Sequence, residues 1–198
     1  MPLEGRGLAF RYGRGPWLFR EFDLSVREGE IVGLAGPSGR GKTTLGRLLA
    51  GYDVPGEGEV LLDGKPLPRS GYCPVQLVFQ HPEKAVNPRL RLRRILNEGW
   101  EPDRSFREAF GIAEQWLDRF PGELSGGELQ RVCIVRALGP DTRFLIADEM
   151  TAMLDALTQA QLWRAVLDIA NERRMGMLVV SHERKLLDRL CHRIVEME

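Results

Sequence analysis

The stretch from Gly36 to Thr43, which reads GPSGRGKT, constrains the fold of this chain more than any other feature. It fits the pattern G-x-x-x-x-G-K-[ST], in which glycines let the backbone curl so that successive N–H groups point at one phosphate group. An apolar run precedes it at 31–36, and a segment with helical spacing of its leucines follows it. The pattern predicts a phosphate-binding loop between a buried strand and a helix, formed by Gly36, Pro37, Ser38, Gly39, Arg40, Gly41, Lys42, Thr43 and Thr44.

Two side chains of this loop carry chemistry. Lys42 can reach the β and γ phosphates of a nucleotide, and the hydroxyl of Thr43 can bind Mg²⁺. The helix that starts here adds the positive end of its dipole to the phosphate site. We therefore expect a nucleotide and Mg²⁺ as ligands.

A second motif, FLIADE, places Asp148 and Glu149 at the end of an apolar strand over 144–148. Ligands of parallel sheets bind at the carboxyl ends of the strands. Asp148 is then positioned to hold Mg²⁺, and Glu149 to polarise an attacking water. Two acids that end a strand are common by themselves, and it is their order after the phosphate loop that favours the functional interpretation.

A third motif, LSGGELQR at 124–131, opens a helix with Ser125, Gly126 and Gly127. A helix that begins with Ser-Gly-Gly offers a second anion-binding N-terminus, with a hydroxyl donor added. Two such N-termini for one nucleotide make sense if the second one binds the nucleotide of a neighbouring subunit.

The order of the predicted elements indicates an α/β fold. Apolar runs and alternation predict strands over 7–12, 22–26, 31–36, 76–80, 144–148, 177–182 and 193–197, and a hairpin over 59–67 with Asp63-Gly64 as its turn. Helices are predicted after the phosphate loop, over 91–98, 105–117, 157–174 and 185–190. The stretch rich in Arg, Glu and Pro after residue 80 predicts a helical insertion into the sheet.

Composition excludes several other classes of protein. The 198 residues carry 28 Lys and Arg against 28 Asp and Glu, and zero net charge argues against a nucleic-acid partner. The longest apolar runs are too short for a bilayer, which needs about 20 residues, and the N-terminus lacks the pattern of a secretory signal. The scattered Cys73, Cys133 and Cys191 are interpreted as reduced, buried residues.

With these motifs in this order, the chain resembles the ATP-binding subunit of an ABC transporter. GPSGRGKTT resembles the Walker A loop, FLIADE the Walker B strand and LSGGELQR the signature motif of that family. Four single residues also resemble family positions. Gln80 resembles the Q-loop glutamine and Asp155 the D-loop aspartate. His182 resembles the H-loop histidine, and Tyr12 the aromatic residue that packs against adenine.

The resemblance implies a P-loop NTPase (RecA-like) core with a mixed sheet, an N-terminal antiparallel β portion and a helical insertion. It implies one domain over 1–198, with the core at 1–80 and 131–198 and the insertion at 81–130. ATP and Mg²⁺ are the implied ligands, with Thr43, Gln80 and Asp148 at the metal and Glu149, His182 and Gln80 catalytic. A second ATP-binding subunit would contribute its Ser125, Gly126, Gly127 and Glu128.

The same resemblance implies transmembrane permease subunits and a solute-binding protein as partners, at the cytoplasmic face of the membrane. The segments VFQHPEKAVNPRL and RFPGELSGGELQRVCIVRAL resemble the corresponding segments of importer ATPases for peptides and nickel. Other importer ATPases share parts of these segments. A soluble ABC ATPase acting on DNA or ribosomes is an alternative, but the 45 residues from Gln80 to Ser125 cannot hold the long coiled coil of repair-type members.

Three positions depart from the family pattern. Glu128 stands where glutamine is commoner, Met150 where proline usually follows the catalytic glutamate, and Ala152 where the D-loop usually has a hydroxyl. A glutamate at 128 still caps a helix, although it brings charge near phosphates. These changes bear on communication between two sites rather than on ATP binding.

Overall fold

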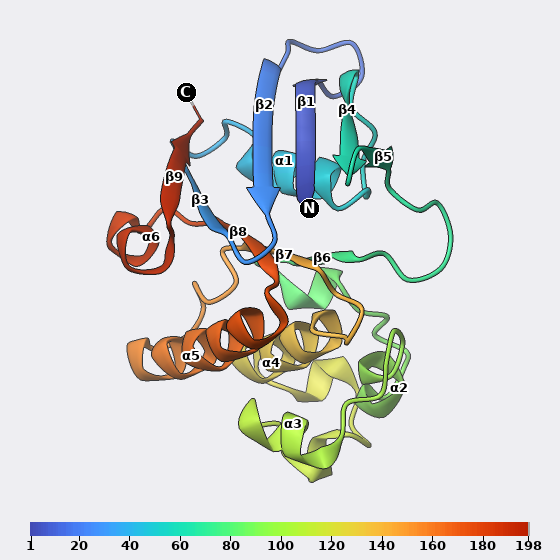
Figure 1. Cartoon of the computed structure of the whole chain (residues 1–198). Coiled ribbons are helices and arrows are strands. Elements are labelled where there is room, and N and C mark those ends of the chain that lie inside the picture. Colours follow the sequence, from blue (N-terminus) through green and yellow to red (C-terminus); the bar gives the residue numbers. More distant parts are fainter. Residues whose placement is uncertain (198) are drawn as a thin grey trace.

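The computed structural model describes residues 1–197 and shows two β-sheets, with helices packed between them and on the far side of one sheet (Figure 1). The strands are β1 Pro2–Phe10, β2 Phe19–Arg27, β3 Ile31–Ala35, β4 Glu57–Leu62, β5 Lys65–Pro66, β6 Val75–Val78, β7 Phe144–Asp148, β8 Gly176–Val180 and β9 Arg193–Glu196. The α-helices are α1 Lys42–Leu49, α2 Leu92–Leu96, α3 Arg104–Ala109, α4 Gly126–Ala137, α5 Ala156–Arg173 and α6 Arg184–Leu190.

The central sheet is parallel, with the strand order β6-β7-β8-β3-β9. Strands β3, β7 and β8 are buried at every residue, because helices cover both faces of a parallel sheet. The expectation of a mixed sheet in the core is therefore corrected, because the antiparallel strands form a separate sheet.

That second sheet has the order β2-β1-β4-β5 and is antiparallel throughout. Its β4–β5 hairpin turns at Asp63-Gly64, as predicted, and both residues have positive φ (55° and 72°). Strand β1 begins at Pro2, five residues earlier than its alternation suggested. The early residues pair with both β2 and β4, so neighbours rather than local pattern define its start.

Helix α1 lies between the two sheets, and the helices α4 and α5 cover the other face of the parallel sheet (Figure 1). Leu45 and Leu49 of α1 pack in one core cluster together with Ile146 of β7. The neighbouring Leu145 faces the second core cluster, to which Val166 of α5 belongs. Alternation along β7 thus divides the interior into two layers.

The predicted helix over 105–117 is wrong in length. Helix α3 ends at Ala109, and Gly111 follows with φ 67°, the left-handed conformation that stops a helix at little cost for glycine. A short 3₁₀ turn, Glu114–Trp116, replaces the rest. The predicted domain boundary between residues 130 and 131 stays a prediction, and α4 runs through it without a break.

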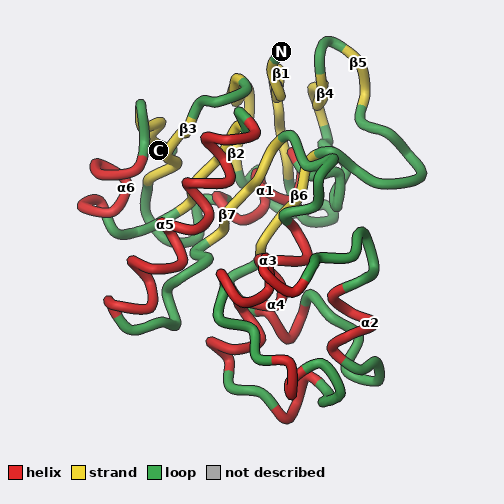
Figure 2. Tube along the Cα trace, turned by 60° about the horizontal axis from the view of Figure 1, so that its bottom comes forward, coloured by secondary structure: helices red, strands yellow, loops and turns green. Residues whose placement is uncertain are grey.

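Helices α2, α3 and α4 gather at one end of the molecule, away from the N-terminus (Figure 2). Among residues 1–197, no helix combines the length and the apolar character that spanning a bilayer requires.

Candidate functional site

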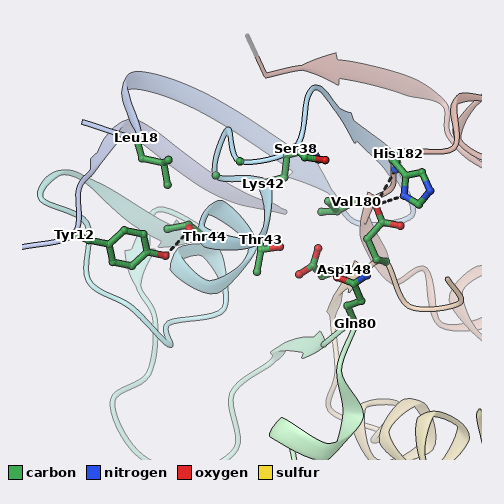
Figure 3. A pocket seen from close by; sticks show the side chains of 13 residues that line it. Tyr12, Leu18, Ser38, Lys42, Thr43, Thr44, Gln80, Asp148, Val180 and His182 are labelled. Atoms are coloured by element: carbon green, nitrogen blue, oxygen red, sulfur yellow. Dashed lines mark hydrogen bonds and ion pairs between the residues drawn. The ribbon is translucent and has the colours of Figure 1, made fainter. Parts of the chain in front are cut away.

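Residues of the predicted motifs, apart from the signature, meet at one edge of the parallel sheet. The phosphate loop follows β3, Gln80 follows β6, Glu149 follows β7 and His182 follows β8. Because these strands are parallel, their carboxyl ends lie side by side. They enclose a pocket of about 430 Å³ (Figure 3). Its lining consists of Tyr12, Leu18, Ser38, Gly39, Gly41, Lys42, Thr43, Thr44, Gln80, Asp148, Glu149, Val180 and His182.

The phosphate loop needs its glycines for conformation and for space. Gly36 has φ 139°, and a Cβ there would lie 2.3 Å from the carbonyl oxygen of Met197. Gly41 has φ 98° and precedes the first residue of α1. Lys42 donates hydrogen bonds from Nζ to the carbonyl oxygens of Gly36 and Pro37, at 2.7 and 2.9 Å. The ammonium group is thus held across the mouth of the curled loop.

Asp148 is 2 % exposed, and its Oδ1 has no hydrogen-bond partner among the described residues. Burial raises the pKa of its carboxyl group, and a hydrogen bond from Thr43 opposes the rise. Thr43 and Gln80 lie around Asp148 in the same pocket (Figure 3). A hydroxyl, a carboxamide and an unpaired carboxylate oxygen are ligands that suit Mg²⁺, so these residues fit the expected metal.

Glu149 is held by the residue that follows β8 by two positions. The backbone N–H of His182 donates to Oε1 of Glu149 at 2.8 Å, and the ring Nδ1 of His182 lies 2.9 Å from the same oxygen (Figure 3). The hydrogen bond with Glu149 raises the pKa of His182. Glu149 has φ 48°, a conformation that non-glycine residues rarely adopt and that is frequent at functional sites.

Tyr12 lies at the far end of the pocket from His182 (Figure 3). Its hydroxyl is 3.0 Å from Oγ1 of Thr44, and its ring meets the ring of Phe10 edge-on, with centroids 5.0 Å apart. The side chain stays exposed, so the ring has a surface available for a flat partner. This position fits the predicted contact with a nucleotide base.

The signature residues lie apart from this pocket, at the start of α4. The side chain of Ser125 accepts a hydrogen bond from the Glu128 N–H at 3.3 Å, and Oε2 of Glu128 accepts one from the Ser125 N–H at 2.7 Å. The hydrogen bond from the backbone N–H of Ser125 lowers the pKa of the Glu128 carboxyl group. Ser125 and Gly126 are exposed. The predicted helix cap by Glu128 is confirmed. The N-terminal end of α4 is exposed to solvent and is not part of the chain's own pocket.

The remaining predicted residues have structural positions outside the pocket lining. Asp155 caps α5 by accepting hydrogen bonds from the N–H groups of Leu157 and Thr158 at 3.1 and 3.0 Å. Arg40 is exposed on the phosphate loop. Gly36 and Pro37 contribute carbonyl groups to Lys42, as described above.

Sequence reasoning missed two apolar residues of the pocket, Leu18 and Val180. Leu18 packs where a side chain on Gly41 would sit, since a Cβ there would be 2.7 Å from its Cδ2. Val180 is the last residue of β8 and lies two residues before His182. The end of the apolar run therefore could have indicated its position next to the site. Leu18 precedes β2, and no local pattern marks it.

The fold and the pocket define a P-loop nucleotide-binding protein. The family model described as ABC transporter matches residues 19–152, and the chain belongs to that family.

Individual relatives agree with this assignment. The nickel import ATP-binding protein NikE of Rhodospirillum rubrum is 36% identical, over 94% of this chain and 75% of its own. NikE of Escherichia coli (strain K12) is 32% identical, over 99% of this chain and 83% of its own. The dimeric structure of a bacterial ABC transporter cassette matches with a TM-score of 0.81 at 23% identity, covering 98% of this chain and 94% of that one. The solved cassette structure therefore shares the fold described above.

Proposed function

We propose that this chain is the ATP-binding and ATP-hydrolysing subunit that powers an ABC importer. The observation that carries the proposal is the separation of two anion sites within one chain. One is the pocket with Lys42 and Glu149, and the other is the exposed, capped start of α4 at Ser125. A single nucleotide cannot use both sites in one chain, whereas two chains arranged head to tail can use all four sites.

Binding begins at the phosphate loop. Backbone N–H groups of the curled loop and the positive end of the α1 dipole stabilise the phosphates, and Lys42 neutralises charge on the β and γ groups. To do so, its Nζ exchanges the carbonyl oxygens of Gly36 and Pro37 for phosphate oxygens. The exposed ring of Tyr12 stacks on the base at the other end of the pocket.

Hydrolysis needs little covalent chemistry from the protein. Thr43, Asp148 and Gln80 would hold Mg²⁺, which would neutralise negative charge on the phosphates. Glu149 orients and polarises the attacking water, and His182 fixes the Glu149 carboxylate through the two contacts described above. The N-terminus of α4 from the second subunit completes charge stabilisation at the γ phosphate.

The proposed assembly places two such subunits under transmembrane permease subunits, at the cytoplasmic face of the membrane. Closure of the two subunits over ATP and reopening after hydrolysis would drive the transport cycle. Peptides or nickel complexes, delivered by a solute-binding protein, are the proposed cargo. Two kinds of observation support that cargo class: the segments that resemble peptide and nickel importer ATPases, and the similarity to nickel import ATP-binding proteins.

The substitution Glu149→Gln tests the proposal. It removes the charge that polarises water and keeps the shape of the pocket. We expect unchanged ATP binding, turnover reduced by about 10²-fold or more, and a stable dimer in the presence of ATP and Mg²⁺. Size-exclusion chromatography with light scattering measures the dimer, and phosphate release measures turnover.

Glu183→Gln is the matched control, because Glu183 is exposed and follows His182 directly. It should retain turnover and should not trap a dimer. A Glu149→Gln protein that stays monomeric with ATP and Mg²⁺ and continues to hydrolyse ATP would overturn the proposed mechanism.

A further inference from the structure

One face of α4 contacts the chain segment 79–85 at three evenly spaced points. Nε2 of Gln130 donates to the carbonyl oxygen of Phe79 at 3.1 Å, and a guanidinium N–H of Arg136 donates to that of Ala85 at 2.8 Å. Between them, Sγ of Cys133 lies 3.9 Å from the carbonyl oxygen of Pro82. Residues three apart on a helix share a face, and the three acceptors are also three apart.

Gln130 is the most constrained member of this set. Its side chain is 2 % exposed, and its Oε1 has no hydrogen-bond partner within residues 1–197. The only polar contact described for its amide is therefore the one to Phe79. A buried amide that makes one of its four possible hydrogen bonds is costly to stability, and such groups are frequently retained for function.

The two segments joined by these contacts serve different nucleotides in the proposed function. Gln80, the residue after Phe79, lines the pocket of its own chain. Helix α4 begins at Ser125, the residue proposed to contact the nucleotide of the second subunit. The distance along α4 from Ser125 to Gln130 is less than two turns.

We propose that Gln130 is a positioning residue for Gln80. By holding the carbonyl group next to Gln80, it makes the position of that side chain depend on the position of α4. A displacement of α4 by the partner's nucleotide then moves Gln80 relative to Asp148 in the chain's own pocket. This inference rests on the proposed function, in particular on the role of Gln80 at the metal.

The substitution Gln130→Met tests it in the full-length chain. Methionine has a similar volume and shape but cannot donate to Phe79. We expect the Mg²⁺ concentration for half-maximal ATPase activity to rise by roughly fivefold, the effect of losing about one hydrogen bond. The affinity for ATP without Mg²⁺, measured with a fluorescent ATP analogue, should stay unchanged. Gln130→Asn, whose amide is too short to reach, provides a second variant if the first does not fold.

A double-mutant cycle with Gln80→Ala separates positioning from general structural damage. If Gln130 acts through Gln80, adding Gln130→Met to Gln80→Ala should not change the Mg²⁺ dependence further. Arg136→Met is the matched control, since it removes the contact at the far end of the segment. Its Mg²⁺ dependence should equal that of the unaltered chain.

The outcomes are distinguishable. If Gln80→Ala leaves the Mg²⁺ dependence unchanged, the proposed role of Gln80 fails. If Gln80→Ala changes it while Gln130→Met has no effect, or if the two effects add, only the positioning role of Gln130 is overturned. A fall in Mg²⁺-free ATP affinity caused by Gln130→Met would also overturn it, because the damage would then extend to the phosphate loop.

Discussion

His182 contacts one carboxylate oxygen of Glu149 with two of its own nitrogen atoms, the backbone N–H at 2.8 Å and the ring Nδ1 at 2.9 Å. The backbone contact fixes the carboxylate whatever the protonation state of the ring. The ring contact is strongest when the imidazole is protonated, and it therefore depends on pH.

The first prediction concerns this pH dependence. The hydrogen bond and the charge of Glu149 raise the pKa of His182 above its usual 6.5. The raised pKa means that the ion pair is present below 6.5 and is lost as pH rises through the raised value. Glu149→Gln should lower the pKa of His182. Titration of the histidine ring signals by NMR measures it, with His182→Asn to assign the resonance.

Glu183 supplies the control for that titration, because it raises the pKa of His182 less than Glu149 does. Glu183→Gln should therefore produce a smaller decrease than Glu149→Gln. Equal pKa values in the unaltered chain and in Glu149→Gln would contradict the described contact.

The second prediction concerns the buried carboxylate of Asp148. Burial raises its pKa, so the folded state binds the proton more tightly than the unfolded state. The cost to stability grows as pH rises from 3.8 through the raised pKa and is fully present above that pKa. Asp148→Asn should raise the melting temperature at pH 7 by about 2–4 °C, the shift that roughly 1 kcal/mol gives in a domain of this size.

The same substitution should abolish Mg²⁺-dependent ATPase activity, so the variant should be more stable but inactive. Calorimetry without nucleotide measures the melting temperature. Asp141→Asn is the control, since Asp141 is exposed and its loss should leave the melting temperature unchanged. A lower melting temperature for Asp148→Asn at pH 7 would show that the carboxylate is stabilising, contrary to its burial.

The third prediction compares two adjacent glycines in α4. Among residues 1–197, a Cβ on Gly126 would have one neighbour within 4 Å, Sδ of Met153 at 3.9 Å, whereas a Cβ on Gly127 would lie 2.8 Å from Cδ2 of Leu154. Alanine favours a helix by about 1 kcal/mol over glycine. Gly126→Ala should therefore fold at least as stably as the unaltered chain, and Gly127→Ala should be less stable than Gly126→Ala.

Gly126→Ala should nevertheless weaken the ATP-dependent dimer, because its methyl group occupies the exposed surface that the partner's phosphates approach. Chromatography in the Glu149→Gln background compares the dimers, and thermal melting compares the folds. An undiminished dimer for Gly126→Ala would mean that nucleotide does not approach this end of α4 closely.

The fourth prediction concerns Lys42. Its two hydrogen bonds to carbonyl groups of Gly36 and Pro37 hold the ammonium group at the proposed phosphate site. Lys42→Ala should weaken ATP binding by about tenfold or more, since a hydrogen bond to a charged group contributes roughly 1.5–3 kcal/mol. Titration calorimetry measures the affinity. An unchanged affinity would contradict the phosphate-loop interpretation.

Much of the site could be predicted from the sequence, because its parts are coded locally. The phosphate loop lies within nine consecutive residues, and the Ser125–Glu128 cap spans one helical turn. Helix α5 spans Ala156–Arg173, within one residue of the predicted ends at 157 and 174. Backbone conformation, capping and amphipathic spacing depend on near neighbours, so a single sequence contains the information.

Other features depended on contacts between distant residues. The sequence placed Glu149 and His182 on separate strands but could not show that two nitrogen atoms of one contact an oxygen of the other, 33 residues away. Nor could it show that Gln130 reaches Phe79, 51 residues earlier. The sequence by itself determined the family, the phosphate loop and the acidic pair. The tertiary structure alone decided which side chains restrain one another, because packing between strands and helices sets those distances and no local pattern encodes them.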